Sequence, residues 1–133
     1  MSTGDVLLQG KHICKSYQQG KKSNRVLNDV DIEIYDGDFT VIMGSSGAGK
    51  STLLYCLSGM DSISGGEVLY RGEEISRYSE KQMASLRTKE FGFVFQQTHL
   101  VSNLTLYENV AVAGYAGGGR KAKEVQDKVR ELL

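Results

Sequence analysis

The first third of the chain has the hydrophobic pattern of β-strands. Residues 5–14 contain enough Val, Leu and Ile for a first strand, and residues 18–24 are polar and predict a loop. Residues 30–34 alternate between apolar and acidic side chains, which is typical of a strand with one exposed face. Residues 39–43 are a short apolar run, typical of a strand that is buried on both faces. Turn-forming residues separate the last two strands, so we expect these two strands to form a hairpin.

Helical signals dominate the rest of the chain. Two capping boxes, in which Ser or Thr is followed three residues later by Gln or Glu, predict helices that begin near Ser79 and Thr105. Residues 125–132 carry apolar side chains at helical spacing among Lys and Glu, which predicts an amphipathic helix. Residues 67–75 are expected to form two short paired strands, and residues 91–95 a further apolar strand.

A glycine-rich stretch lies between the apolar run at residues 39–43 and an apolar helix expected at residues 51–57. Its sequence, Gly44-Ser45-Ser46-Gly47-Ala48-Gly49-Lys50-Ser51, matches the phosphate-binding pattern G-x-x-x-x-G-K-[ST] at every specified position. The order of strand, glycine loop and helix points backbone N–H groups and a helix N-terminus toward one anion. We therefore expect an α/β fold that binds a nucleoside polyphosphate.

Each specified residue in this loop has a chemical role. Gly44, Gly47 and Gly49 are expected to adopt positive φ, so that the backbone approaches phosphate oxygens without a Cβ in the way. Lys50 is expected to reach the β- and γ-phosphates, and the Ser51 hydroxyl to ligate Mg²⁺. The alternative, a turn that only joins a strand to a helix, is disfavoured by the complete pattern in its expected context.

Composition limits the other possibilities. The 133 residues are enough for one domain with a core, and 16 basic residues balance 16 acidic ones, which gives no electrostatic case for nucleic acid. Cys14 and Cys56 are too few for a disulfide framework or a zinc site, and Cys56 is expected to be a small buried side chain. The sequence has no signal-peptide pattern and no run of apolar residues that is long enough to span a bilayer. His12, inside the first strand, is given no functional role.

Several stretches together resemble the nucleotide-binding subunit of ATP-binding cassette (ABC) transporters. Lys15-Ser16-Tyr17 is similar to the adenine-stacking loop of this family, residues 44–52 to its Walker A motif, and residues 93–97 to the strand that enters its Q-loop. Residues 86–97, followed by Leu100, Leu104 and Glu108-Asn109-Val110, resemble the branch that serves macrolide, lipoprotein and antimicrobial-peptide exporters.

This resemblance implies a P-loop NTPase core with a small antiparallel β-subdomain in residues 1–95, and a Q-loop with the start of a helical subdomain in residues 96–133. Tyr17 is then expected to stack on adenine, and the Gln96 amide to contact Mg²⁺ and the attacking water. The alternatives are a tyrosine at the rim of the core and a polar residue at the end of a strand. The residues implied to bind ATP are Tyr17, Gly44, Ser45, Ser46, Gly47, Ala48, Gly49, Lys50, Ser51 and Thr52.

The resemblance also implies partners and a location. Residues Gln96 to Asn109 are expected to contact a transmembrane permease subunit, and the complete protein to dimerise at the cytoplasmic face of the cell membrane, with no nucleic acid as partner. In this family hydrolysis also needs an apolar strand ending in Asp-Glu, a signature motif and a switch histidine beyond the Q-loop, and none occurs in the sequence. We therefore expect the N-terminal part of a cassette that binds Mg-ATP with little turnover. A non-catalytic nucleotide-binding fragment and a P-loop kinase of small molecules are the alternatives.

Overall fold

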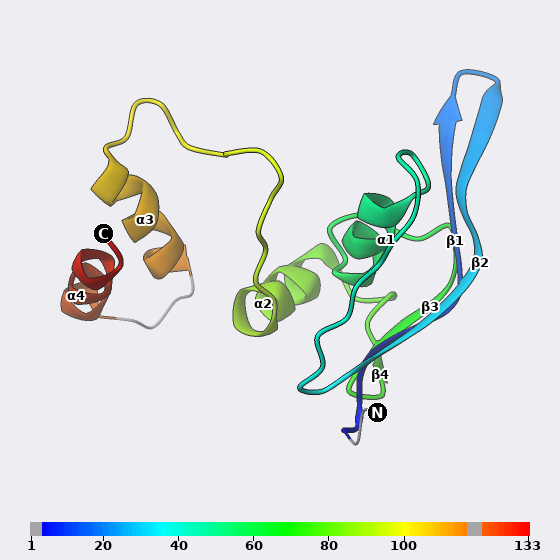
Figure 1. Ribbon diagram of the computed structural model, residues 1–133, viewed down its shortest axis with the longest axis horizontal. Helices are drawn as coiled ribbons and strands as arrows, with labels where there is room; N and C mark the ends of the chain where they lie inside the picture. Colours follow the sequence, from blue (N-terminus) through cyan, green and yellow to red (C-terminus); the bar gives the residue numbers. More distant parts are fainter. Residues whose placement is uncertain (1–3, 117–120) are drawn as a thin grey trace. The chain divides into compact units, whose positions relative to one another are not determined.

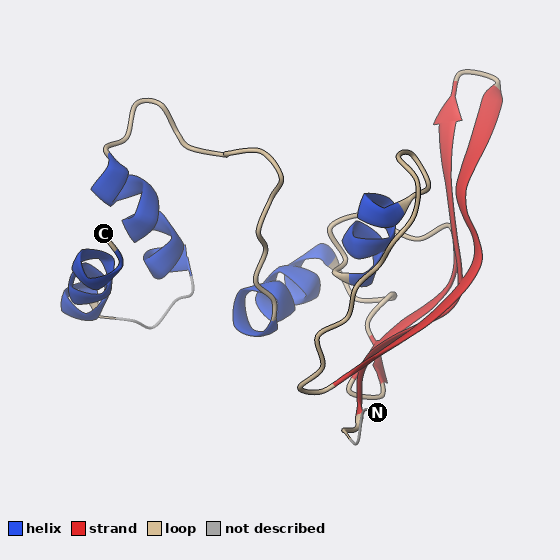
Figure 2. Cartoon of the chain, in the orientation of Figure 1, coloured by secondary structure: helices blue, strands red, loops and turns tan. Residues whose placement is uncertain are grey.

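The computed structural model describes residues 4–116 and 121–133 (Figure 1). These residues divide into two compact units, and the division lies between Met83 and Ala84. Figure 2 distinguishes the helices from the strands. In chain order the elements are β1 (Val6–Gln19), β2 (Lys22–Tyr35), α1 (Lys50–Leu57), β3 (Gly65–Tyr70), β4 (Glu73–Glu74), α2 (Glu80–Glu90), α3 (Leu106–Ala116) and α4 (Ala122–Leu132).

The first unit contains a four-stranded antiparallel sheet with the strand order β2-β1-β3-β4. β1 and β2 form a long hairpin, in which pairing continues to Gln19 opposite Lys22. Residues 18–24 are therefore mostly strand, and the loop predicted there is wrong, because a backbone ladder does not require apolar side chains. The predicted hairpin between residues 30–34 and 39–43 is also wrong, because β2 pairs with β1.

The apolar core of this unit combines the sheet with α1, which contacts β1 and β2. Cys56 is a free cysteine and is buried, and its burial is as predicted. The predicted pairing within residues 67–75 is confirmed by the ladder between β3 and β4. The buried apolar side chains of the unit are Leu8, Ile13, Leu27, Leu53, Cys56, Leu57, Val68, Ile75 and Met83.

Two predicted strands are absent from the described part of the chain. Residues 39–43 and 91–95 have no regular secondary structure, and the side chains of Phe39 and Met43 are 95% and 86% exposed. A buried parallel strand needs a hydrogen-bonded neighbour on each side. None of the described strands pairs with either segment, so the apolar runs lie on the surface instead of in a sheet.

In the second unit, α3 and α4 pack against each other. Val125 and Val129 of α4 are buried with Ala111 of α3, which confirms the predicted amphipathic helix.

Both predicted capping boxes form. The Ser79 N–H donates to Gln82 Oε1 over 2.9 Å at the start of α2, and the Thr105 N–H donates to Glu108 Oε2 over 2.7 Å at the start of α3. The glycine run at residues 117–119 of the sequence predicts a helix break, and it lies outside the described residues.

A bulge interrupts β1 at His12. The register of β1 shifts there relative to both neighbouring strands, β2 and β3. His12 and its partner Asp29 both have positive φ, +50° and +53°. The His12 Nδ1 atom lies 2.6 Å from Asp29 Oδ1, and the His12 N–H donates to Asp31 Oδ1 over 2.7 Å. On the other side of the bulge, Gly66 of β3 has φ of +88° and lies directly against the carbonyl groups of Lys11 and His12. The bulge is therefore fixed by contacts with both strands.

We predict that Gly66→Ala destabilises the protein more than Gly72→Ala. Both glycines have positive φ, but a Cβ on Gly66 would overlap with backbone atoms, whereas a Cβ on Gly72 would meet no atom within 4 Å. Gly72→Ala therefore measures the cost of the backbone conformation alone. The additional overlap should lower the free energy of unfolding by a further 1–3 kcal/mol, roughly the cost of overpacking, measured by urea titration. Equal effects of the two substitutions would contradict this.

We predict that Asp29→Asn lowers the pKa of His12. The hydrogen bond to Asp29, followed by the charge of Asp31, raises this pKa above its ordinary value. The ion pair therefore stabilises the fold fully below the pKa of the unfolded imidazole, and this stabilisation is lost as the pH rises through the folded pKa. Asn tolerates positive φ, so the substitution preserves the backbone. An NMR titration of the imidazole should show a larger decrease for Asp29→Asn than for Asp31→Asn. An unchanged midpoint would exclude the proposed cause.

Candidate nucleotide site

The glycine-rich loop leads directly into α1, whose first residue is Lys50. Gly47 and Gly49 have φ of +78° and +95°, as predicted. The same prediction is wrong for Gly44, whose φ is not positive; a Cβ there would make an ordinary contact with Ala48. The Lys50 ammonium donates to the carbonyl oxygens of Gly44 and Ser45, at 2.5 Å and 2.7 Å. The lysine side chain therefore follows the loop back to its start.

Close packing against β2 holds the end of the loop in place. An ideal Cβ on Gly49 would lie 3.1 Å from side-chain carbons of both Val26 and Leu27, so the backbone approaches β2 more closely than a larger residue allows. Within α1, Leu53 and Leu57 are buried in the core. The direction of the helix is thus set by packing.

The backbone N–H groups at the N-terminus of α1 are suited to bind an anion. Gly49 is the N-cap and offers no side-chain hydrogen bond, and the first turn contains no acidic residue. The first N–H groups of a helix have no partner within the helix, and the helix dipole favours negative charge at this end. Gly47 has open space around it, and Ser51 is exposed in the first turn. This arrangement suits phosphate oxygens, with Lys50 supplying a positive charge.

Tyr17 lies near the end of β1 and reaches the first turn of α1. Its hydroxyl donates to Asp61 Oδ2 over 2.6 Å, and this bond raises the pKa of Tyr17 above its ordinary value. The Thr52 hydroxyl also contacts the phenol oxygen and acts in the opposite direction on this pKa. The structure therefore brings Tyr17 close to Thr52, at the helix end that follows the loop.

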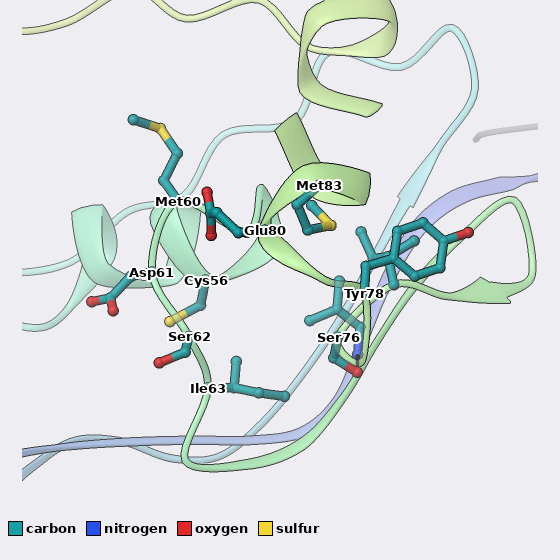
Figure 3. Close-up of a pocket in the computed structure, with 12 residues that line it drawn as sticks. Cys56, Met60, Asp61, Ser62, Ile63, Ser76, Tyr78, Glu80 and Met83 are labelled. Carbon is teal, nitrogen blue, oxygen red and sulfur yellow. Dashed lines mark hydrogen bonds between the residues drawn. The ribbon is translucent and has the colours of Figure 1, made fainter. Parts of the chain in front are cut away.

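Asp61 is a residue of this region that the sequence did not reveal. It lies 44 positions from Tyr17, and no periodic pattern connects the two. Asp61 is at the rim of a cavity of about 300 Å³ whose walls come from α1, β3 and the start of α2. Figure 3 shows Asp61 on the opposite side of this cavity from Tyr78 and Met83.

Gln96 belongs to the second unit and lies in an exposed bend after residues 91–95. Its predicted contact with the metal ion and water stays a prediction. In residues 4–116 and 121–133 no group of three His, Cys, Asp or Glu side chains is arranged to hold a metal ion. Within the same residues, no helix has the length and apolar character needed to cross a membrane.

Asn109 shapes the segment that follows Gln96. Its side chain accepts a hydrogen bond from the Val101 N–H over 2.8 Å and donates to the carbonyl oxygens of Val101 and Thr105, at 3.2 Å and 2.9 Å. The Phe95 ring meets the His99 ring edge-on, with 4.9 Å between their centres. The exposed apolar side chains of this segment include Leu100, Val101 and Leu106.

Comparison with known proteins places these features in a family. The sequence profile described as ABC transporter matches residues 27–133. The chain is 41% identical over 112 residues to the lipoprotein-releasing system ATP-binding protein LolD of Wigglesworthia glossinidia brevipalpis. The aligned region covers 84% of this chain and 49% of that protein. The chain therefore spans about half the length of this relative.

Solved structures show the same fold. The ATP-binding cassette MJ0796 in a dimeric post-hydrolysis state, bound to ADP and Pi, superposes with a TM-score of 0.86 at 31% identity, over 94% of this chain and 55% of that one. A second dimeric structure of MJ0796, described as a bacterial ABC transporter cassette, gives the same values. The predicted P-loop NTPase fold of the cassette type is thus confirmed. With a family match that covers most of its length, the chain belongs to the ABC transporter family.

Proposed function

We propose that this chain binds Mg-ATP as part of the ATP-binding subunit of an ABC transporter. The observation that carries the proposal is the uncapped N-terminus of α1, preceded by Gly47 and Gly49 in their positive-φ conformation and occupied by Lys50 at its first position. The phosphates would lie against the loop formed by residues 44–49, and the base against Tyr17. Membership of the ABC transporter family supports a nucleotide as the anion.

The metal ion is expected to depend on the nucleotide. Mg²⁺ prefers oxygen ligands in octahedral geometry and usually retains water molecules. Ser51 offers one exposed hydroxyl in the first turn of α1, and the described residues contain no acidic cluster for a second site. We infer that Ser51, phosphate oxygens and water hold the ion. A bound Mg²⁺ would offset charge on the phosphates.

For the complete protein we propose ATP hydrolysis that drives export across the membrane. The name of the LolD relative describes a lipoprotein-releasing system, and both MJ0796 structures are dimeric. By analogy we propose a dimer of ATP-binding subunits at the cytoplasmic face of the membrane. The sequence contains no apolar run that ends in Asp-Glu, so we infer little turnover from residues 1–133 by themselves.

Residues 96–109 are proposed to contact a transmembrane subunit. Three apolar side chains of this segment, Leu100, Val101 and Leu106, are exposed. The hydrogen bonds of Asn109 to Val101 and Thr105 hold the segment in a defined conformation. An exposed apolar surface with a fixed backbone is suited to bind another protein.

We predict that Lys50→Ala weakens ATP binding about 10- to 100-fold, because a hydrogen bond from a charged donor contributes roughly 1.5–3 kcal/mol. Isothermal titration calorimetry with Mg-ATP would measure the change. Arg77→Ala is the matched control: it also removes one positive charge from the first unit, but Arg77 is exposed and forms an ion pair with Glu74. If both variants bind ATP equally well, the loop is not the phosphate site.

We predict that Ser51→Ala weakens the binding of ATP in the presence of Mg²⁺ and has little effect in EDTA. The substitution removes the hydroxyl that would ligate the ion, while the backbone N–H groups of the loop remain. Ser51→Thr keeps a hydroxyl at this position and should preserve the effect of Mg²⁺ on the dissociation constant. Equal losses for Ser51→Ala with and without metal would argue against a role for Ser51 as a ligand.

A further inference from the structure

A hydrogen-bond network centred on Asp61 connects the end of β1 to the chain that follows α1. The two carboxylate oxygens have separate donors: Oδ2 accepts from the Tyr17 hydroxyl over 2.6 Å, and Oδ1 from Lys15 Nζ over 2.9 Å. Lys15 also donates to the backbone oxygen of Ser62 over 2.5 Å. The carboxylate therefore cannot rotate without breaking one of its two bonds.

Lys15 is unusually buried for a charged residue. It is only 6% exposed, and its ion pair with Asp61 is partly shielded from water. The hydrogen bond from Tyr17, and then the bond from Lys15, hold the pKa of Asp61 below its ordinary value. Asp61 is thus charged at neutral pH, and its carboxylate accepts from the Tyr17 hydroxyl.

The same lysine covers one face of the tyrosine ring. Lys15 Nζ lies over the Tyr17 ring, 4.9 Å from its centre, which is within the range of a cation–π contact. Tyr17 as a whole is 38% exposed. Because Lys15 lies over one face of this half-exposed ring, a flat ligand would stack on the opposite face.

Further hydrogen bonds hold the chain segment that carries Asp61. The Ser64 N–H donates to the Cys14 carbonyl over 2.8 Å, and the Ser16 N–H donates to the Ser64 hydroxyl over 2.9 Å. These bonds hold the chain after α1 alongside the end of β1. In Figure 3, Asp61 lies at the edge of the cavity lined by Met83 and Tyr78, with its carboxylate pointing away from both residues.

We propose that Asp61 and Lys15 are positioning residues that hold the ring of Tyr17 ready to stack against the nucleotide base. This inference rests on the function proposed above. One bond fixes the hydroxyl end of the ring, and the ammonium group supports one face. Asp61 and Lys15 act through Tyr17 and do not themselves touch the nucleotide.

The energetic effect is preorganisation. A free tyrosine side chain loses rotamer freedom when it stacks on a base, and this loss weakens binding. In this protein the ring is ordered before the nucleotide arrives. The network should therefore affect ligands that carry a base and leave ligands that carry only phosphates unaffected.

Binding of ATP and of inorganic tripolyphosphate, each with Mg²⁺, tests this inference by calorimetry. Tyr17→Phe keeps the ring and the Lys15–Asp61 pair but removes the bond to Asp61. We expect it to raise the dissociation constant of ATP about 2- to 10-fold, the effect of ordering one side chain on binding, and to leave that of tripolyphosphate unchanged. Asp61→Asn should act in the same direction. If loss of the ion pair prevents Asp61→Asn from folding, Tyr17→Phe by itself still tests the inference.

Tyr17→Ala separates this inference from the proposed function. If Tyr17→Ala weakens ATP binding while Tyr17→Phe and Asp61→Asn do not, the ring stacks on the base without help, and the positioning role is overturned. A parallel loss of ATP and tripolyphosphate binding in Tyr17→Phe would show that the network only supports the fold, which also overturns it. An unmodified protein that binds neither ligand would instead overturn the proposed function.

Discussion

The candidate site depends on the close approach of Gly49 to β2. With no side chain at this position, the backbone lies against Val26 and Leu27, and its φ of +95° turns the chain into α1. Burial of Leu53 and Leu57 then holds the helix against the sheet. The direction of the helix axis, and with it the direction of its first N–H groups, follows from these contacts. An anion site at a helix N-terminus is only as well defined as the packing behind it.

Features encoded within a few residues were predictable from the sequence. Both capping boxes form because their donors and acceptors are three residues apart, and α1 follows the glycine loop as its pattern requires. The two apolar strands expected at residues 39–43 and 91–95 failed for the opposite reason. A strand exists only where another strand supplies hydrogen bonds, and the local pattern of residues 39–43 contains no information about a partner.

In the candidate site, too, residues within a local sequence pattern were predictable, and residues joined by tertiary contacts were not. Lys50 and Ser51 were identified by pattern, because the chemistry of the glycine loop is contained in eight consecutive residues. The resemblance to a known family singled out Tyr17, but nothing in the sequence pointed to Asp61. The contact between these two residues depends on how β1 and the chain after α1 are placed against each other, as the bonds of Ser64 show. Such tertiary placement cannot be read from spacing or composition.

The ion pair between Lys15 and Asp61 is better explained by its effect on the orientation of Tyr17 than by a contribution to the free energy of unfolding. Removing two charges from water is costly, and an apolar pair of similar volume often stabilises a fold as well or better. Apolar contacts, however, lack the directionality of a hydrogen bond. The Asp61 carboxylate offers one oxygen to Lys15 and the other to Tyr17, so it couples a buried charge to the orientation of an aromatic ring beside the first turn of α1. An apolar residue at position 61 would fill the same space and leave the tyrosine hydroxyl without this acceptor.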